Sequence, residues 1–141
     1  MDATLRPVLT RKGQESANTG QSGGAVRISG VSAQNTPATK IWFGKASNEP
    51  GFRSLPHHHG EAETGIYVLS GWGRVYFGTG YREFIDCREG DFAFVPPFMP
   101  HIEVNMSTAE ELWWMVCRTP ENIVVNLDDV GDETLEGYRR R

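Results

Sequence analysis

Three of the four histidines in this 141-residue chain lie together, in a stretch that also carries two carboxylates. The stretch reads Leu55-Pro56-His57-His58-His59-Gly60-Glu61-Ala62-Glu63. Residues two positions apart on an extended strand face the same side, so His57 and His59 project together and His58 points away. A turn through the following glycine would bring Glu63 back beside them. Two imidazoles and a carboxylate that converge on one point suit a divalent transition metal.

Two simpler interpretations of the triplet stay open: a solvated loop, and part of a purification tag. A tag is disfavoured because the run is short, internal and followed by acids rather than a linker. The fourth histidine, His101, lies 42 residues after His59 in an ordered stretch of its own, and this strengthens the metal hypothesis.

Composition bounds the class of protein. The chain carries 14 basic and 18 acidic residues, a net charge of -4, which argues against a nucleic-acid binder. No apolar run approaches the roughly 18 residues of a membrane span. The first residues lack the hydrophobic segment of a signal peptide, so we expect a cytoplasmic protein.

The length predicts one domain in three parts. Residues 1–24 are rich in Gly, Ser, Gln and Thr and predict a flexible arm, because they cannot bury enough apolar area to offset ordering entropy. Residues 25–127 form the folded domain. Residues 128–141 form an acidic tail ending in three arginines, which we expect to be solvated. Cys87 and Cys117 are expected to be reduced thiols within strands.

Short β-branched and aromatic runs, separated by glycine and proline turns, predict an antiparallel all-β domain. The clearest hairpin signal is Ser70-Gly71-Trp72-Gly73, whose glycines permit positive φ. The expected strands cover residues 25–29, 40–44, 52–59, 66–69, 74–77, 83–87, 92–95, 98–105, 112–117 and 122–127.

Two spaced motifs in this pattern resemble those of the cupin superfamily. The first is Gly51, five residues, His57, one residue, His59, three residues, Glu63. The second is Gly90, five residues, Pro96, one residue, Phe98, two residues, His101, three residues, Asn105. The resemblance covers about residues 40–127. It implies a double-stranded β-helix, a small jelly-roll barrel, and a metal near its open end held by His57, His59, Glu63 and His101.

The chain departs from the family pattern at two places. The second motif ordinarily has glycine where Phe98 stands. Seven residues separate Glu63 from Gly71, where the family usually has six. Counted back from Gly71, the ligand position falls on Thr64, a poor metal ligand, so we expect a small bulge after Glu63, with Glu61 as a weaker substitute.

The implied ligand set is compatible with several metals. Imidazole suits Zn, Cu, Fe and Ni, whereas carboxylate suits Mn, so Fe, Mn, Ni and Zn are all candidates. Four protein ligands in an octahedron leave two positions for water, oxygen or substrate.

Four further residues are candidates for the site. Glu103 shares the face of His101 and could act as a general base or orient a ligand; a solvated rim carboxylate is the alternative. Arg53 could bind a substrate carboxylate; the alternative is an ordinary surface arginine. Tyr67 and Trp114 could line a substrate cavity; the alternative is that they only pack in the core.

The resulting hypothesis is a small-molecule metalloenzyme of dioxygenase, isomerase or lyase type. The alternative is a non-catalytic module that binds or senses a small ligand or metal, since one fold hosts many chemistries. The full ligand set argues against a metal-independent epimerase. We expect a homodimer, because unpaired sheet edges need covering and the arm could cross to a neighbour.

Overall fold

The computed structural model describes residues 5–18 and 26–141, and within them the chain is built almost entirely of β-strands. The strands are β1 (Val26–Val31), β2 (Trp42–Asn48), β3 (His57–His58), β4 (Glu63–Ser70), β5 (Trp72–Phe77), β6 (Glu83–Arg88), β7 (Phe92–Val95), β8 (His101–Asn105), β9 (Leu112–Thr119) and β10 (Val125–Asn126). Two short 3-10 turns are η1 (Thr79–Tyr81) and η2 (Asp132–Thr134). Among the described residues, no helix has the length and apolar character needed to cross a membrane.

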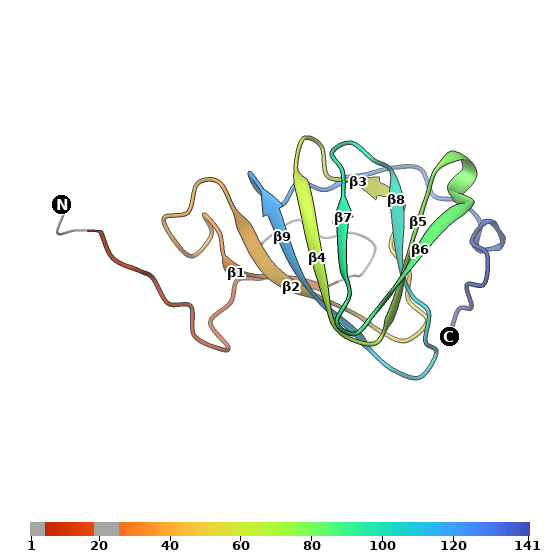
Figure 1. Cartoon of the computed structure of the whole chain (residues 1–141), viewed down its shortest axis with the longest axis horizontal. Helices are drawn as coiled ribbons and strands as arrows, with labels where there is room; N and C mark the ends of the chain where they lie inside the picture. Colours follow the sequence, from red (N-terminus) through yellow and green to blue (C-terminus); the bar gives the residue numbers. More distant parts are fainter. Residues whose placement is uncertain (1–4, 19–25) are drawn as a thin grey trace.

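The strands form two antiparallel five-stranded sheets that face each other. One has the order β1-β2-β9-β4-β7, and the other has the order β10-β3-β8-β5-β6. Figure 1 shows the two sheets curling into a barrel, with the N-terminal segment leading away from it. The all-β double-stranded β-helix expected from the sequence is confirmed.

Strand β9 illustrates why these residues fold this way. It lies between β2 and β4, and its residues alternate strictly between buried and half-exposed positions. Leu112, Trp114, Val116 and Arg118 face the interior and are each at most 3% exposed. Alternation of this kind buries one face of a sheet against its partner.

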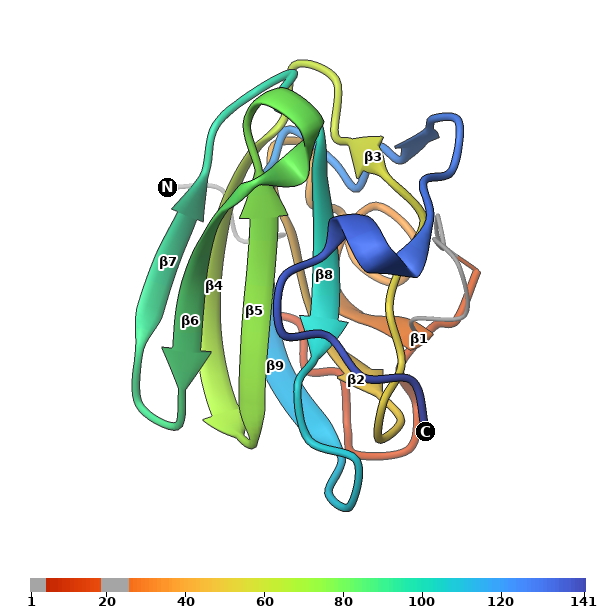
Figure 2. The same ribbon diagram turned by 90° about the vertical axis from the view of Figure 1, so that its right-hand side faces the viewer.

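A second core lies outside the barrel, on the far face of β5 and β8. Tyr76, Ile102 and Val104 are buried there beneath the C-terminal segment. Figure 2 shows that segment crossing in front of β8. Leu135 is 2% exposed in this cluster, so the tail packs on the barrel at this residue, whereas Arg139, Arg140 and Arg141 are exposed as expected of a solvated tail. Val130 and Tyr138 of the same segment also pack against this cluster, and the acidic composition of the tail hid all three residues.

The outer face of the first sheet is unusually apolar. Phe92 is 81% exposed, and its ring lies 4.7 Å from that of Tyr67.

The expected arm partly falls outside the described residues; residues 5–15 form no strand or helix, and Ser16 pairs with Ser29. The expected homodimer stays a prediction.

Candidate metal centre

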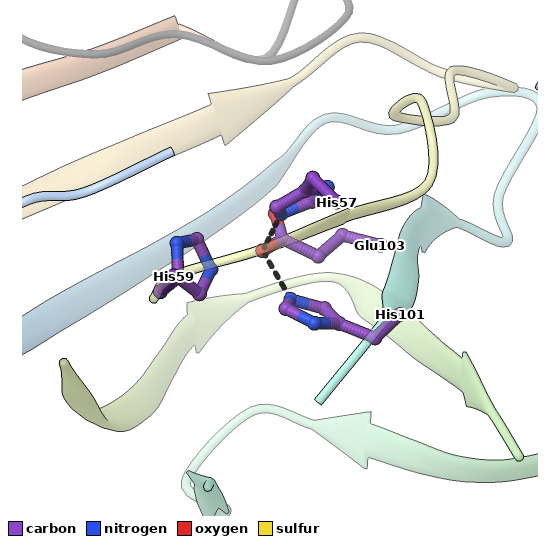
Figure 3. Close-up of side chains that lie close together, drawn as sticks. All are labelled: His57, His59, His101 and Glu103. Atoms are coloured by element: carbon purple, nitrogen blue, oxygen red, sulfur yellow. Dashed lines mark hydrogen bonds and ion pairs between the residues drawn. The ribbon is translucent and has the colours of Figure 1, made fainter. Parts of the chain in front are cut away.

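Four side chains converge at one end of the barrel interior. One potential ligand atom from each of His57, His59, His101 and Glu103 lies within 4.8 Å of all the others. Figure 3 shows His57 and His101 on either side of the Glu103 carboxylate, with His59 facing them. All four residues are at most 3% exposed.

Strand pairing explains this convergence. His57 on β3 is the direct antiparallel partner of His101 on β8. His59 follows two residues after His57, so its side chain returns to the same side. On β8, the same alternation places Glu103 beside His101, whereas Ile102 faces the second core.

Each imidazole is fixed by a hydrogen bond from its Nδ1 atom to a backbone carbonyl. The pairs are His57 with Leu55 O at 2.8 Å, His59 with Ile123 O at 2.7 Å and His101 with Met99 O at 2.9 Å. A carbonyl can only accept, so Nδ1 carries the proton in all three rings. Each ring therefore turns its Nε2 atom to the interior, as metal-binding histidines do.

Glu103 supplies the negative charge of the cluster. Its burial opposes ionisation, but the positive charge of Arg27 outweighs that effect and holds the pKa of Glu103 well below its ordinary value. The Arg27 guanidinium lies 3.5 Å from Glu103 Oε2. The other oxygen, Oε1, lies 3.3 Å from His57 Nε2 and 3.4 Å from His101 Nε2.

Two of the histidines, His57 and His59, are held neutral by their surroundings. Burial lowers the pKa of His57, and burial together with the charge of Arg118 lowers the pKa of His59 to about 2. Two neutral Nε2 atoms and a carboxylate oxygen therefore face one another as acceptors, and the buried His57 Nε2 has no donor among the described residues. A bound cation would convert these contacts into coordination, so the donor set fits a divalent metal.

A buried arginine closes the cluster on the side of His59. Arg118 places Nη2 3.0 Å from His59 Nε2 and donates from Nε to Thr64 Oγ1 at 3.0 Å. Thr64 on β4 and Arg118 on β9 are direct cross-strand partners, which explains the contact. Burial lowers the pKa of Arg118 to about 9, so the guanidinium stays charged at neutral pH.

Glu63, the acid expected from the sequence motif, lies outside the cluster. It is exposed at the start of β4, whereas the next residue, Thr64, faces inward. The bulge expected after Glu63 is absent there: pairing with β9 runs unbroken to Val68 and shifts only between Val68 and Ser70. The ligand position counted back from the next glycine is therefore the one that faces the interior, and Glu103 is the acid that the structure brings to the histidines.

The other candidates lie in different surroundings. Arg53 donates to Asp132 at 2.7 Å and to Asp129 at 3.0 Å, so it anchors the C-terminal segment. Tyr67 packs on the outer face of the first sheet. Trp114 faces the interior, but within the apolar core, where its indole N–H donates to Asn48 at 3.0 Å.

The other departure from the family pattern also has a structural form. Phe98 adopts φ +59, a left-handed conformation that favours glycine, and its N–H donates to Gly60 O at 2.8 Å. The loop thus keeps the backbone shape of a glycine position without the glycine.

Sequence reasoning missed two residues of this end of the barrel, Arg27 and Arg118. Each lies on an alternating strand, at an inward position that would ordinarily be apolar. A charged residue in register with buried neighbours, such as Arg118 after Leu112, Trp114 and Val116, was the available signal.

Comparisons with known proteins agree with this fold. A family profile described as Cupin matches residues 14–137. An uncharacterised Klebsiella pneumoniae protein with a double-stranded β-helix domain is 18% identical, with a TM-score of 0.62 over 79% of this chain and 91% of that one. TT1209 from Thermus thermophilus is 22% identical, with a TM-score of 0.55 over 68% and 83%.

A longer neighbour is oxalate decarboxylase from Bacillus subtilis, which is 22% identical with a TM-score of 0.63. The alignment covers 76% of this chain but only 28% of that protein. No curated protein sequence matches this chain.

Proposed function

We propose, from the premise that this chain belongs to the cupin family, that it is a small-molecule metalloenzyme. The divalent metal would be held by the Nε2 atoms of His57, His59 and His101 and by the Glu103 carboxylate. The proposal replaces Glu63 with Glu103 as the acidic ligand and keeps the three histidines expected from the sequence.

One observation carries the proposal. Three buried imidazoles all donate Nδ1–H to backbone carbonyls, and one potential ligand atom of each lies within 4.8 Å of the others and of one carboxylate oxygen. Burying unpaired acceptors together costs free energy, and no apolar core requires it. Such pre-oriented ligands, each supported by a backbone acceptor, are what a metal centre needs.

The ligand set suits manganese or iron, with nickel and zinc as the other candidates. Three nitrogens and one carboxylate oxygen form a mixed set of intermediate softness. The similar oxalate decarboxylase of Bacillus subtilis is described as having Mn(II) centres, which supports testing manganese first. When bound, the metal would supply Lewis acidity or redox chemistry at its free coordination positions.

The protein's own residues prepare this chemistry. The neutral rings of His57 and His59 do not compete for protons near neutral pH, because burial lowers their pKa values. Arg27 holds the Glu103 carboxylate in its anionic form. Burial of all four side chains excludes bulk water, which strengthens electrostatic interactions with a bound substrate.

Elemental analysis of untagged protein, purified without a nickel column and after reconstitution with each candidate metal, tests the metal centre. We expect near-stoichiometric metal in the wild type and its loss in a folded His59→Ala, His101→Ala double variant. The matched control is His58→Ala, because His58 is adjacent in sequence but outside the cluster and accepts a hydrogen bond from Gly60 N–H. Metal-free wild type after reconstitution would reject the proposal.

Activity is tested separately on the metal-loaded protein. Oxygen consumption screens the iron form for dioxygenase activity, and product analysis screens the manganese form for lyase and isomerase reactions. Stoichiometric metal without turnover of any substrate would favour the alternative, a non-catalytic module that binds a small ligand.

A further inference from the structure

Among the described residues, the arginines with buried side chains fall into two kinds. Arg27, Arg53 and Arg74 each pair with a carboxylate, at 3.5 Å, 2.7 Å and 2.7 Å respectively. Arg118 is 1% exposed, yet among the described residues no carboxylate lies within 4.0 Å of its guanidinium. A buried cation without a counter-ion is costly and is usually paired or used.

All the hydrogen-bond partners of Arg118 are neutral. They are Thr64 Oγ1 at 3.0 Å, Asn122 Oδ1 at 2.6 Å and His59 Nε2 at 3.0 Å. These contacts hold the guanidinium in place without neutralising it. The charged groups around the cluster are Arg27, Arg118 and Glu103, which leave an excess of one positive charge even before a metal binds.

The contact with His59 links Arg118 to the metal centre. His59 donates Nδ1–H to Ile123 O, so its Nε2 has a single lone pair, which now accepts from Arg118. That lone pair cannot serve Arg118 and a metal together. Metal binding would therefore release one guanidinium N–H group, buried and without an acceptor, next to the metal.

A hollow lined by Asn122, which accepts from Arg118 at 2.6 Å, provides an approach. It has a volume of about 120 Å³, the space of about four water molecules at ~30 Å³ each, and is also lined by Trp42, Pro120 and the acidic Glu121, whereas Arg118 itself does not line it. The Trp42 ring centre lies 5.9 Å from the Arg118 guanidinium carbon. The indole Nε1–H is buried and has no acceptor among the described residues, so a second donor is available here.

We propose that Arg118 and the Trp42 indole N–H form a subsite for a small carboxylate, which enters by the hollow next to Pro120 and Asn122. The inference rests on the proposed function and adds a substrate class to it: a small anionic molecule with one carboxylate held by Arg118 beside the metal. Metal and anion then bind cooperatively, because the metal frees the Arg118 donor that the carboxylate accepts.

Calorimetric titration with acetate, and with acetamide as its neutral isostere, tests the subsite on Mn(II)-loaded and metal-free protein. We expect acetate to bind the Mn(II) form more tightly than the metal-free form. Acetamide should bind at least about tenfold more weakly, because charge-assisted hydrogen bonds are the stronger ones.

Three variants separate the residues. Arg118→Gln should weaken acetate binding about tenfold or more while Mn(II) content stays at the wild-type level. Arg118→Lys keeps the charge but not the planar fork, so it should weaken binding less and serves if the Gln variant misfolds. Trp42→Phe removes the indole N–H together with part of the ring and should weaken acetate binding about fivefold. The control Arg53→Gln, whose arginine is paired elsewhere, should bind acetate like the wild type.

The outcomes for the two proposals are distinct. Wild-type acetate affinity in both Arg118 variants, or equal affinity for acetate and acetamide, overturns the subsite even if Mn(II) binds. Failure of the wild type to take up metal overturns the proposed function instead. The subsite is then judged on metal-free protein, where tighter acetate binding by wild type than by Arg118→Gln supports it and equal binding rejects it.

Discussion

The barrel interior contains two layers of opposite chemistry, built from the same strands. We call one the apolar layer; it comprises Trp42, Ala46, Ile66, Val68, Cys87, Val95, Leu112, Trp114 and Val116. The other is the charged layer, which comprises Arg27, His57, His59, His101, Glu103 and Arg118. Both are almost completely buried, so burial does not distinguish them.

Strand β9 passes through both layers in a single register. Trp114 and Val116 pack in the apolar layer, and Arg118, two residues further on, reaches the charged layer. Alternation along the strand therefore fixes which way a side chain faces. How far along the strand the residue lies decides whether its side chain joins the apolar or the charged layer. The apolar layer holds the sheets together, and the charged layer uses that stability to keep buried polar groups in place.

The largest expected effect breaks the apolar layer. Trp114→Ala should lower the free energy of unfolding by about 3–5 kcal/mol, because it leaves a large cavity and removes the donor to Asn48. Its neighbour Trp113 faces outward and is only half-buried, so Trp113→Ala should cost about 1 kcal/mol or less. Urea denaturation of both variants measures the difference. Equal losses would contradict the layer assignment.

The next effect concerns the charged layer and its acid. Manganese at a hundred times its dissociation constant should stabilise the wild type by about 2.7 kcal/mol, because only the folded state presents the assembled ligands. Glu103→Gln should abolish most of this gain, whereas the exposed Glu63→Gln should retain it. Thermal melts with and without Mn(II) measure the gain. Loss of the gain in Glu63→Gln alone would restore the acid expected from the motif.

The contrast between these two acids shows how far the sequence leads. Alternation and turn residues predicted the fold, and alternation predicted that His57 and His59 share a face, because both are local properties of a strand. His101 was added to them by the resemblance to the cupin motifs. The choice of acid depended on where the strand accommodates the extra residue between Glu63 and Gly71. The pairing of β4 with β9 shows that the irregularity lies after Val68 rather than after Glu63.

The contacts of the two arginines in the charged layer could not be predicted from local sequence either, because they depend on strands far apart in the chain. Arg27 and Glu103 are 76 residues apart in sequence, and their contact requires β1 and β8 to meet across the barrel. Arg118 reaches His59 across 59 residues. Alternation alone predicted that these positions face inward, but only the closed barrel shows which charges they meet.

A smaller effect is the pH dependence of stability that the charged layer contributes through His59. An unfolded histidine titrates near pH 6.5, whereas in the folded protein burial and Arg118 lower the pKa of His59 to about 2. Below pH 6.5, His59 therefore binds a proton in the unfolded state but not in the native state, and the free energy of unfolding falls as the pH drops. For His59 the loss between pH 7 and pH 5.5 should be about 1 kcal/mol in metal-free protein.

Urea midpoints across this pH range, compared between wild type and His59→Gln, measure that loss. The variant cannot take up the proton, so its stability should fall less steeply with acid. The same slope in both proteins would show that the pKa of His59 in the native state is not lowered from its unfolded value.

The smallest expected effect lies in the backbone that leads into the charged layer. Phe98 holds φ +59 three residues before His101, and its side chain is 63% exposed, so little burial compensates for the unfavourable conformation. Phe98→Gly should stabilise the protein by up to about 1 kcal/mol, because glycine adopts this conformation freely. Phe98→Ala keeps a β-carbon and should give no gain. Since neither change touches a ligand, Mn(II) content should stay at the wild-type level in both. Thermal melts and elemental analysis measure the two effects. A higher melting temperature with unchanged metal content would show that the loop stores strain independently of the site. Reduced metal content in Phe98→Gly would instead show that the phenylalanine conformation positions His101.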